Sequence, residues 1–300
     1  MQSQRRICRQ TVLTFAAVCL LSTPVMAHPG SGIAVDRLGQ IYFLDTGSGL
    51  WKIDVHGKLV QISRTMFHWL AIDPNDRFTN TPLLSGTSGD ITKVGSNPTL
   101  LLASDFPIAI GQNGNLYYPA GPPGGLRIMR MMPSGDTSVL TTLPVTVRGG
   151  PLPHINGLTN GPDGSLYYTE NDTIRRITEE GQVSTVVTVP ALVGGSSMPG
   201  VSADTRPFLR GLAIDASGVI YVAATGCGRV LKIARDGKVT TLIQTQSPWS
   251  PTAVAVSGSD VFVLEYLLTT TESRREWLPR VRKIAADGTS TIIATIDRRG

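Results

Sequence analysis

The stretch Arg210–Ile243, RGLAIDASGVIYVAATGCGRVLKIARDGKVTTLI, decides the fold of this 300-residue chain. It contains four short apolar runs, separated by turns that are rich in Gly, Asp and Ser. The same arrangement begins at Ser31 with SGIAVDRLGQIYFLDTGSGLWKIDVHGKLVQI. Gly, Asp and Asn at such positions supply the turns of β-hairpins. Each copy therefore predicts an antiparallel meander of four strands.

The phrase that opens this unit returns along the chain at intervals of 37 to 54 residues, starting at Ser31, His68, Phe106, Asn156, Arg210 and Thr252. Repeats of about 40–50 residues with four strands each are typical of propeller blades. We therefore predict an all-β, six-bladed β-propeller of four-stranded antiparallel blades over residues 28–300. The second unit is degraded, because FTNTPLLSG (residues 78–86) replaces its aromatic second strand.

Glycines recur at matching places in the inner strands, at Gly32, Gly157 and Gly211. Six strands crowd together near a propeller axis, and glycine permits their backbones to approach closely. Six units of four strands leave no spare strand. We therefore expect the first and last blades to close the ring by packing face to face, without strand exchange.

Residues 1–27 have the features of a signal peptide. The segment opens with three arginines, continues with the apolar run Thr11–Leu21 and ends in the small-residue pattern Val25–Ala27. The apolar run is shorter than the ~20 residues that a membrane-spanning helix needs. We expect cleavage after Ala27, export to the periplasm or the cell exterior, and no membrane insertion of the mature chain.

Composition limits the partners of the mature chain. Without its first 27 residues the chain keeps 24 basic and 22 acidic side chains, in no long block of one sign. Nothing in this pattern favours nucleic acid. Cys227 is the one cysteine left, so no intramolecular disulfide forms. We expect a monomer whose partner is a small molecule or a protein.

The inserted loops indicate which face of the propeller carries function. In a four-stranded meander, the entry to the first strand and the connection between the second and third strands lie on one side. The long insertions all fall in these two classes; they are Gly121–Gly125, Pro144–Pro153, Pro190–Leu209 and Tyr266–Pro279. Because loops on a rigid scaffold often carry function, we predict the binding surface on this face.

Polar residues open several inner strands at the expected mouth of the channel. We predict a ligand-binding site made of these residues and of a histidine that points the same way by strand periodicity, namely Ser31, His68, His154, Asn156 and Arg210. Polar groups that converge on a concave axis are typical of a binding pocket. No catalytic residue is assigned.

Arg210 and His68 each have two interpretations. Arg210 is a charged donor that suits a carboxylate or phosphate ligand, or it pairs with Glu170 or Glu265 at the rim. His68, like Asn156, could orient a ligand or hold a metal. Alternatively, His68 is a half-buried packing residue beside Trp69.

Other polar residues favour structural roles. Asp36, Asp73 and Asp215 follow inner strands, where turn capping is the better interpretation than metal binding. Cys227 has no neighbour that clearly lowers its pKa, which disfavours a catalytic thiol. Trp249 lies in a loop on the favoured face, as a ligand-stacking residue or as a loop anchor.

The phrases GIAVDRLGQIYFLD, GLAIDASGVIYVAATGCGRVLKIARDG and AVAVSGSDVFVLE resemble NHL repeats and the gluconolactonase (senescence-marker) propellers. The resemblance covers nearly all of the mature chain and implies a TolB-like six-bladed propeller with an axial site. The lactonases of that family bind a divalent metal through a Glu on the first inner strand, an Asn in an N-G-[LI] phrase and an Asp.

This chain departs from that ligand set. Asn156-Gly157-Leu158 resembles the second phrase, but Arg210 stands at the place of the Asp, and no Glu is found near Ser31. A cation beside Arg210 would be poorly held, so we predict no metal, no other cofactor and no ordinary metal-dependent lactonase activity.

The sequence leaves three functions open. The first is a binding module for a small ligand or a protein on the long-loop face. The second is a hydrolase or lyase with a rebuilt axial site, since GLTNGPDGSLYYTENDTIRRITEEG from Gly157 resembles a repeat of the streptogramin-type lyases, although their catalytic His has no dependable match. The third is a structural interaction domain. Fold likeness alone does not choose among them.

Overall fold

The computed structural model describes residues 29–85, 90–95, 97–121, 125–143, 154–190, 207–270 and 275–297. The predicted signal peptide with its cleavage site after Ala27 lies outside these residues, as does most of the two long insertions before the fourth and fifth blades. Among the described residues, no helix is long and apolar enough to cross a membrane.

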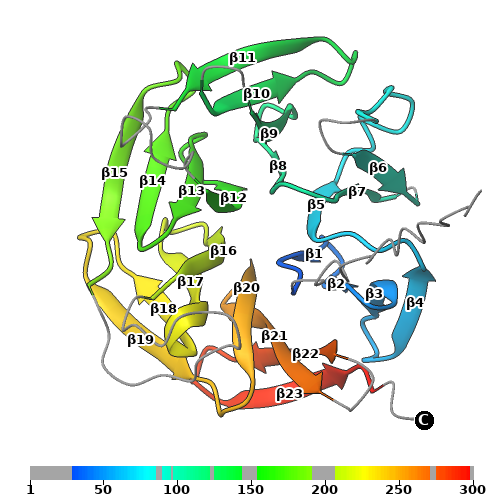
Figure 1. The fold of residues 1–300 in the computed structure, drawn as a ribbon, viewed down its shortest axis with the longest axis vertical. Coiled ribbons are helices and arrows are strands. Elements are labelled where there is room, and N and C mark those ends of the chain that lie inside the picture. The colour runs from blue at the N-terminus through cyan, green and yellow to red at the C-terminus, as the bar shows by residue number, and fades with distance from the viewer. Residues whose placement is uncertain are drawn as a thin grey trace, which may run out of the picture.

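Six β-sheets are arranged in a ring around a common axis (Figure 1), which confirms the six-bladed propeller. Five sheets are antiparallel meanders of four strands in sequence order. The first contains β1 (Ile33–Val35), β2 (Ile41–Asp45), β3 (Gly49–Ile53) and β4 (Leu59–Ser63). The third contains β8 (Ala109–Ile110), β9 (Leu116–Ala120), β10 (Arg127–Met131) and β11 (Thr137–Thr142).

Blades four to six follow the same plan. Blade four contains β12 (Ile155–Asn160), β13 (Leu166–Glu170), β14 (Thr173–Ile177) and β15 (Val183–Thr188). Blade five contains β16 (Leu209–Ile214), β17 (Ile220–Ala224), the short 3-10 helix η1 (Thr225–Cys227), β18 (Arg229–Ile233) and β19 (Val239–Gln244). Blade six contains β20 (Ser250–Ser257), β21 (Asp260–Thr270), β22 (Arg275–Ile284) and β23 (Ser290–Thr295).

Blade two departs from the predicted four-stranded meander. Its described strands are β5 (Trp69–Asp73), β6 (Ile91–Val94) and β7 (Thr99–Ala103), and β7 lies between the other two. The reason is burial, because the apolar run TLLLA of β7 is buried at every residue and takes the place of the missing aromatic second strand. The carboxylate of Asp76 accepts a hydrogen bond from the backbone N–H of Thr99 at 2.6 Å and fixes the start of β7.

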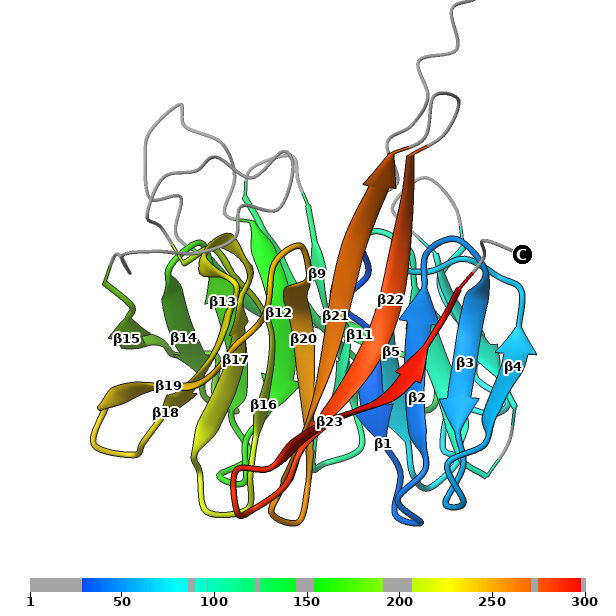
Figure 2. The ribbon, with the colours of Figure 1, turned by 90° about the horizontal axis from the view of Figure 1, so that it is seen from below.

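Blade six contains a second difference. The segment Tyr266–Pro279 was expected to be an inserted loop, but β21 and β22 continue into it as a long hairpin. Cross-strand pairs such as Leu267 with Leu278 keep the two strands in register. Figure 2 shows that this hairpin projects beyond the rest of the ring on one face.

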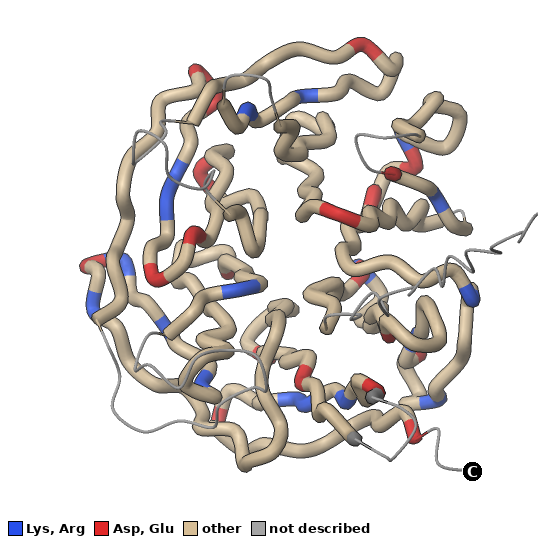
Figure 3. Tube along the Cα trace, viewed as in Figure 1, with Lys and Arg blue, Asp and Glu red and all other residues tan. Residues whose placement is uncertain are grey.

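Aspartates after the inner strands cap turns, as predicted. Asp36 Oδ1 accepts hydrogen bonds from the backbone N–H groups of Leu38 and Gln40 at 2.9 Å. Asp215 plays the same part in blade five. Figure 3 shows Lys and Arg interspersed with Asp and Glu around the ring, so no blade presents a single sign of charge.

The predicted close approach of inner strands is confirmed. A Cβ atom on Gly157 would lie 2.6 Å from the backbone oxygen of Arg210 in the next blade. A Cβ atom on Gly211 would lie 2.6 Å from the Cβ of Ala253 in blade six. Neither glycine has a positive φ, so the constraint at both positions is space alone.

Ring closure also follows the prediction. Each described sheet is built from one continuous part of the sequence, and a shared core joins Ile33 and Phe43 of blade one to Leu264 and Tyr266 of blade six. The hydroxyl of the fully buried Tyr266 donates a hydrogen bond to the backbone oxygen of Leu44. Apolar packing and the buried hydroxyl of Tyr266 therefore connect the first and last blades.

We expect Gly157→Ala to lower the free energy of unfolding by about 1–3 kcal/mol, because the added methyl group overpacks two backbones that cannot separate. Urea denaturation measures the effect. Gly121→Ala is the control, since a Cβ there meets nothing within 4 Å. Equal stability of both variants would show that the inner strands have room to move.

We expect Tyr266→Phe to lower the unfolding free energy by about 1 kcal/mol or more, because its hydroxyl donates to Leu44 and also interacts with the backbone N–H groups of Gly30 and Thr46. The matched control is Tyr118→Phe, since Tyr118 is buried and its hydroxyl makes no hydrogen bond to another described residue. If both variants unfold at the same urea concentration, the bond to Leu44 contributes nothing to ring closure.

Candidate functional site

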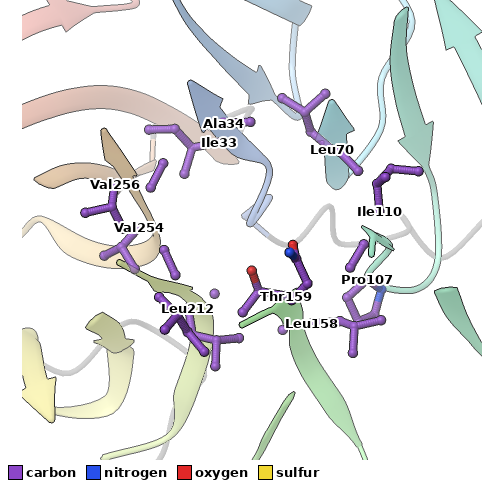
Figure 4. A pocket seen from close by; sticks show the side chains of 18 of the residues that line it. Ile33, Ala34, Leu70, Pro107, Ile110, Leu158, Thr159, Leu212, Val254 and Val256 are labelled. Atoms are coloured by element: carbon purple, nitrogen blue, oxygen red, sulfur yellow. The ribbon is translucent and has the colours of Figure 1, made fainter. Parts of the chain in front are cut away.

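A cavity of about 510 Å³ runs along the propeller axis and is lined by the inner strands of all six blades. Figure 4 shows aliphatic side chains from these strands around the cavity, among them Ile33, Leu70, Leu158, Leu212 and Val254. Each inner strand has one edge without a neighbouring strand. Backbone N–H and C=O groups on that edge make the cavity suitable for polar contents.

Two of the predicted site residues, Ser31 and Asn156, line this cavity at the end where the inner strands begin. Two others lie beside them. The backbone N–H of Ser31 donates to the backbone oxygen of His68 at 2.8 Å, and Arg210 precedes the cavity residue Gly211. His68 and Arg210 are not among the residues that line the cavity, and His154 is exposed just before β12.

Three buried polar atoms at this end of the cavity have no hydrogen-bond partner within the described residues. They are Ser31 Oγ, Trp69 Nε1 and Asn156 Nδ2. The indole N–H and the amide N–H₂ can only donate, and the hydroxyl can do both. Buried polar groups without a partner are rare in folded proteins and call for an explanation.

Trp69 is the residue that sequence reasoning missed as a site member. It was considered only as a packing neighbour of His68, yet it lines the cavity. Its place at the start of the inner strand β5 could have indicated that it lies near the axis. Strand periodicity did not show that its indole N–H has no partner.

Arg210 is buried, and within the described residues its side chain makes one hydrogen bond, from Nη2 to the backbone oxygen of Pro29 at 2.9 Å. Burial lowers the pKa of its guanidinium to about 10, with the nearby Tyr266 acting in the opposite direction. The guanidinium therefore stays charged at neutral pH.

The expected structural alternative for Arg210 is not observed. Glu170 pairs with Arg175 at 2.8 Å, and the fully buried Glu265 pairs with Arg280 and with Arg282. Within the described part of the chain, no carboxylate lies within ion-pair distance of Arg210. Its charge is therefore uncompensated by any described residue.

His68 combines both of its interpretations. Its ring lies edge-on to that of Trp69, with centroids 6.3 Å apart, as a packing residue would. Its Nδ1 lies 2.6 Å from the backbone oxygen of Ser104, so that nitrogen carries the proton. Burial, with help from the charge of Arg210, lowers the pKa of His68. The imidazole is therefore neutral at neutral pH.

The residues at this end do not fit the metal that the family resemblance implies. Asn156 keeps the matching place, but its Nδ2 is a buried donor without a partner among the described residues, and Arg210, whose backbone packs against Gly157, stands where the family has an Asp. No three His, Cys, Asp or Glu side chains of the described residues come together as a metal site.

Two lesser candidates have structural roles. Cys227 is buried, and burial raises the pKa of its thiol, which works against a nucleophilic thiolate. The ring of Trp249 packs under the guanidinium of Arg280, whose Cζ lies 4.0 Å from the ring centroid. This contact favours the loop-anchor interpretation of Trp249.

The cavity continues toward the face opposite the strand starts. A second hollow of about 440 Å³ shares the lining residues Val35, Ile72, Ile110, Gln112 and Asn160 with it. Lining residues at this end, such as Pro162 and Ala216, are exposed, whereas Pro29 and Arg210 at the polar end are buried. Among the described residues, access is therefore widest on the face opposite the projecting hairpin.

The fold and the axial cavity define a six-bladed β-propeller. Residues 128–271, just under half of the chain, match the family SMP-30/Gluconolactonase/LRE-like region. The 6-deoxy-6-sulfogluconolactonase of Pseudomonas putida is 33% identical over 133 residues. That match covers 43% of this chain and 42% of that protein, so the chain aligns with less than half of its length.

Solved structures repeat the fold. The calcium-binding protein regucalcin from Agrobacterium tumefaciens strain C58 overlaps with a TM-score of 0.52 at 16% identity, over 78% of this chain and 81% of that one. Virginiamycin B lyase from Staphylococcus aureus overlaps with a TM-score of 0.49 at 17% identity, over 88% and 83% of the two chains. Identities this low show likeness of fold alone, and the sequence resemblance to gluconolactonase-like propellers is confirmed.

We expect the stability of the protein to fall as the pH drops below the ordinary His pKa of 6.5, in part because of His68. Its pKa is lower in the folded chain, so the unfolded chain binds the proton first, and stability is complete above 6.5 and decreases down to the folded value. His68→Gln should reduce the loss of unfolding free energy between about pH 7.5 and about pH 5.

The matched control for this pH series is His56→Gln, because His56 is exposed in a hairpin turn. Urea denaturation at each pH gives the unfolding free energies. If the His56 and His68 variants show the same pH slope as the wild-type protein, the burial of His68 has no measurable cost.

Proposed function

We propose that this propeller binds a small polar ligand at the strand-start end of its axial cavity, with Ser31, His68, Trp69, Asn156 and Arg210 as the binding residues. The observation that carries the proposal is the group of three buried polar atoms without partners at that end. An unsatisfied buried donor costs about 1–3 kcal/mol. A ligand that accepts these hydrogen bonds recovers that free energy on binding.

The size of the cavity supports this proposal. A volume of about 510 Å³ lies within the usual range for small-molecule sites, which is about 300–1,000 Å³. The site is rigid, because its residues stand at the starts of inner strands that pack directly on one another. A protein partner on the long-loop face is the alternative occupant, with the projecting β21–β22 hairpin as its contact.

The remaining parts of the proposal concern the whole protein. We propose that the chain is exported to the periplasm or the cell exterior after cleavage behind Ala27 and acts as a monomer. We propose that it binds no nucleic acid and needs no metal or other cofactor.

A lactonase-type hydrolase is the second candidate, because the family match and the Pseudomonas putida relative both concern lactonases. In this role Asn156, His68 and Arg210 would hold a lactone at the axis without metal. Release of acid from gluconolactone or its 6-sulfo analogue, followed by pH-stat, distinguishes this candidate. Turnover that persists with EDTA and is lost in Asn156→Leu would favour the hydrolase over the binding module.

We expect Asn156→Leu to weaken ligand binding at least about tenfold, which corresponds to about 1.4 kcal/mol. Without ligand the variant should be as stable as the wild-type protein, because it removes a buried amide that has no partner. Isothermal titration calorimetry with sugar acids, sugar lactones and free sugars measures binding.

Asn115→Leu is the matched control, since Asn115 lies half-buried in the turn before β9. It should bind like the wild-type protein. Wild-type affinity in the Asn156 variant, for a ligand that the protein does bind, would place the binding site elsewhere.

A further inference from the structure

The segment Pro29–Ser31 lies across the strand-start end of the axial cavity. The backbone oxygen of Pro29 accepts a hydrogen bond from Arg210 Nη2 at 2.9 Å, and the backbone N–H of Ser31 donates to the backbone oxygen of His68 at 2.8 Å. Arg210 belongs to blade five, and His68 directly precedes the inner strand of blade two. Inner strands contact one another in sequence order around the ring, so blades two and five stand on opposite sides of the axis (Figure 1). A segment of three residues that is bonded to both blades therefore crosses the axis.

Gly30, the middle residue of this segment, is packed between further blades. A Cβ atom there would lie 3.3 Å from Thr46 Cγ2 of blade one, from the Tyr266 hydroxyl of blade six and from the backbone oxygen of His68. The backbone N–H of Gly30 also interacts with that hydroxyl. Pro29 and Gly30 are both buried. The segment therefore fills the space between blades one, two, five and six.

The opposite end of the axial cavity has no comparable cover within the part of the chain that the structure describes. Gln112, Pro162 and Ala216 line the cavity there, and all three are exposed. The hollow of about 440 Å³ adjoins this end and shares Gln112 and Asn160 with the cavity. Among the described residues, the cavity is therefore a well that is closed at the strand starts and open at the strand ends.

We infer that Pro29–Ser31 is a closing segment held in place by Arg210, and that a ligand enters the axial cavity from the face opposite the inserted loops. The bond from the guanidinium suits this role, because charge-assisted hydrogen bonds are roughly twice as strong as neutral ones. Arg210 is in this respect a positioning residue, since it acts through the segment that it holds. The inference goes beyond the proposed binding function, because it concerns the way into the cavity and holds whichever molecule binds there.

The first test measures hydrogen exchange of single amides in the purified protein. We expect the amides of Gly30 and Ser31 to exchange at least about a hundredfold more slowly than that of Ser259 in an exposed turn, because exchange requires the segment to leave the axis. Arg210→Met should speed the exchange of both amides at least about tenfold, and Arg210→Lys should speed it less. Arg235→Met, at an exposed arginine, should leave it unchanged.

The amides of β18, a core strand of blade five, are the internal reference for this test. If they speed up in Arg210→Met as much as the closing segment does, Arg210 stabilises the whole fold and its role in closure is refuted. Exchange of Gly30 and Ser31 at the rate of Ser259 in the wild-type protein would overturn the closure itself. This last comparison needs no variant, so it decides the question even where Arg210→Met does not fold.

The second test locates the entrance with a thiol probe. Thr159→Cys places a thiol on a residue of β12 that lines the cavity (Figure 4), and the wild-type protein is the background because Cys227 is buried. We expect methyl methanethiosulfonate to modify this probe in the folded protein. Pro162→Trp together with Ala216→Trp narrows the open end and should slow the modification at least about tenfold. Ser259→Trp, in an exposed turn apart from the lining residues, should not change the rate.

The narrowed protein also tests the part of Arg210. Adding Arg210→Met to it should restore the modification rate at least in part, because a second opening forms at the strand-start end. No restoration would refute the hold of Arg210 on the segment. An unchanged rate after narrowing would show that the reagent enters from the loop face, and a probe that never reacts would show a cavity closed at both ends; either result overturns the inference. No arm uses a ligand, so failure of the proposed binding function does not affect these results.

Discussion

The close packing of six inner strands around one axis is the constraint on which the rest of this structure depends. Gly157 and Gly211 stand where a single methyl group would collide with the next blade. The blades approach one another so closely that only a backbone without a side chain fits between them at these positions. That distance in turn fixes the width of the axial cavity and the positions of all residues that open the inner strands.

The same convergence explains why a polar site lies at the axis. Blades satisfy most of their hydrogen bonds between neighbouring strands, but an innermost strand has a neighbour on one side only. Donors at the strand starts, such as Trp69 Nε1 and Asn156 Nδ2, are buried beside the cavity and have no hydrogen-bond partner among the described residues. Arg210 forms no ion pair with the acids Glu170 and Glu265 of the adjacent blades. Glu170 pairs with Arg175, and Glu265 pairs with Arg280 and Arg282.

Sequence periodicity predicted the blades well and the exceptions poorly. Alternating apolar runs and Gly-turns placed most strands to within one or two residues, since both signals are local. Blade two was beyond such reasoning. The apolar strand β7 occupies the centre of this sheet, where all of its residues are buried. Which segment takes that position depends on contacts across the whole sheet, and a local pattern does not contain them. The β21–β22 hairpin was mistaken for a loop because polar residues interrupt its pattern.

By itself, the sequence determined the all-β propeller, its six blades, the capped turns and the place of the inner strands, because each of these follows from repeats and turn chemistry within one blade. It also predicted a site near the starts of the inner strands, made of Ser31, His68, His154, Asn156 and Arg210. Tertiary structure alone decided that Trp69 joins them, that Arg210 has no acid partner among the described residues, and that His154 stays at the rim. Partners across blades depend on distances between residues far apart in the chain, and no local pattern encodes those distances.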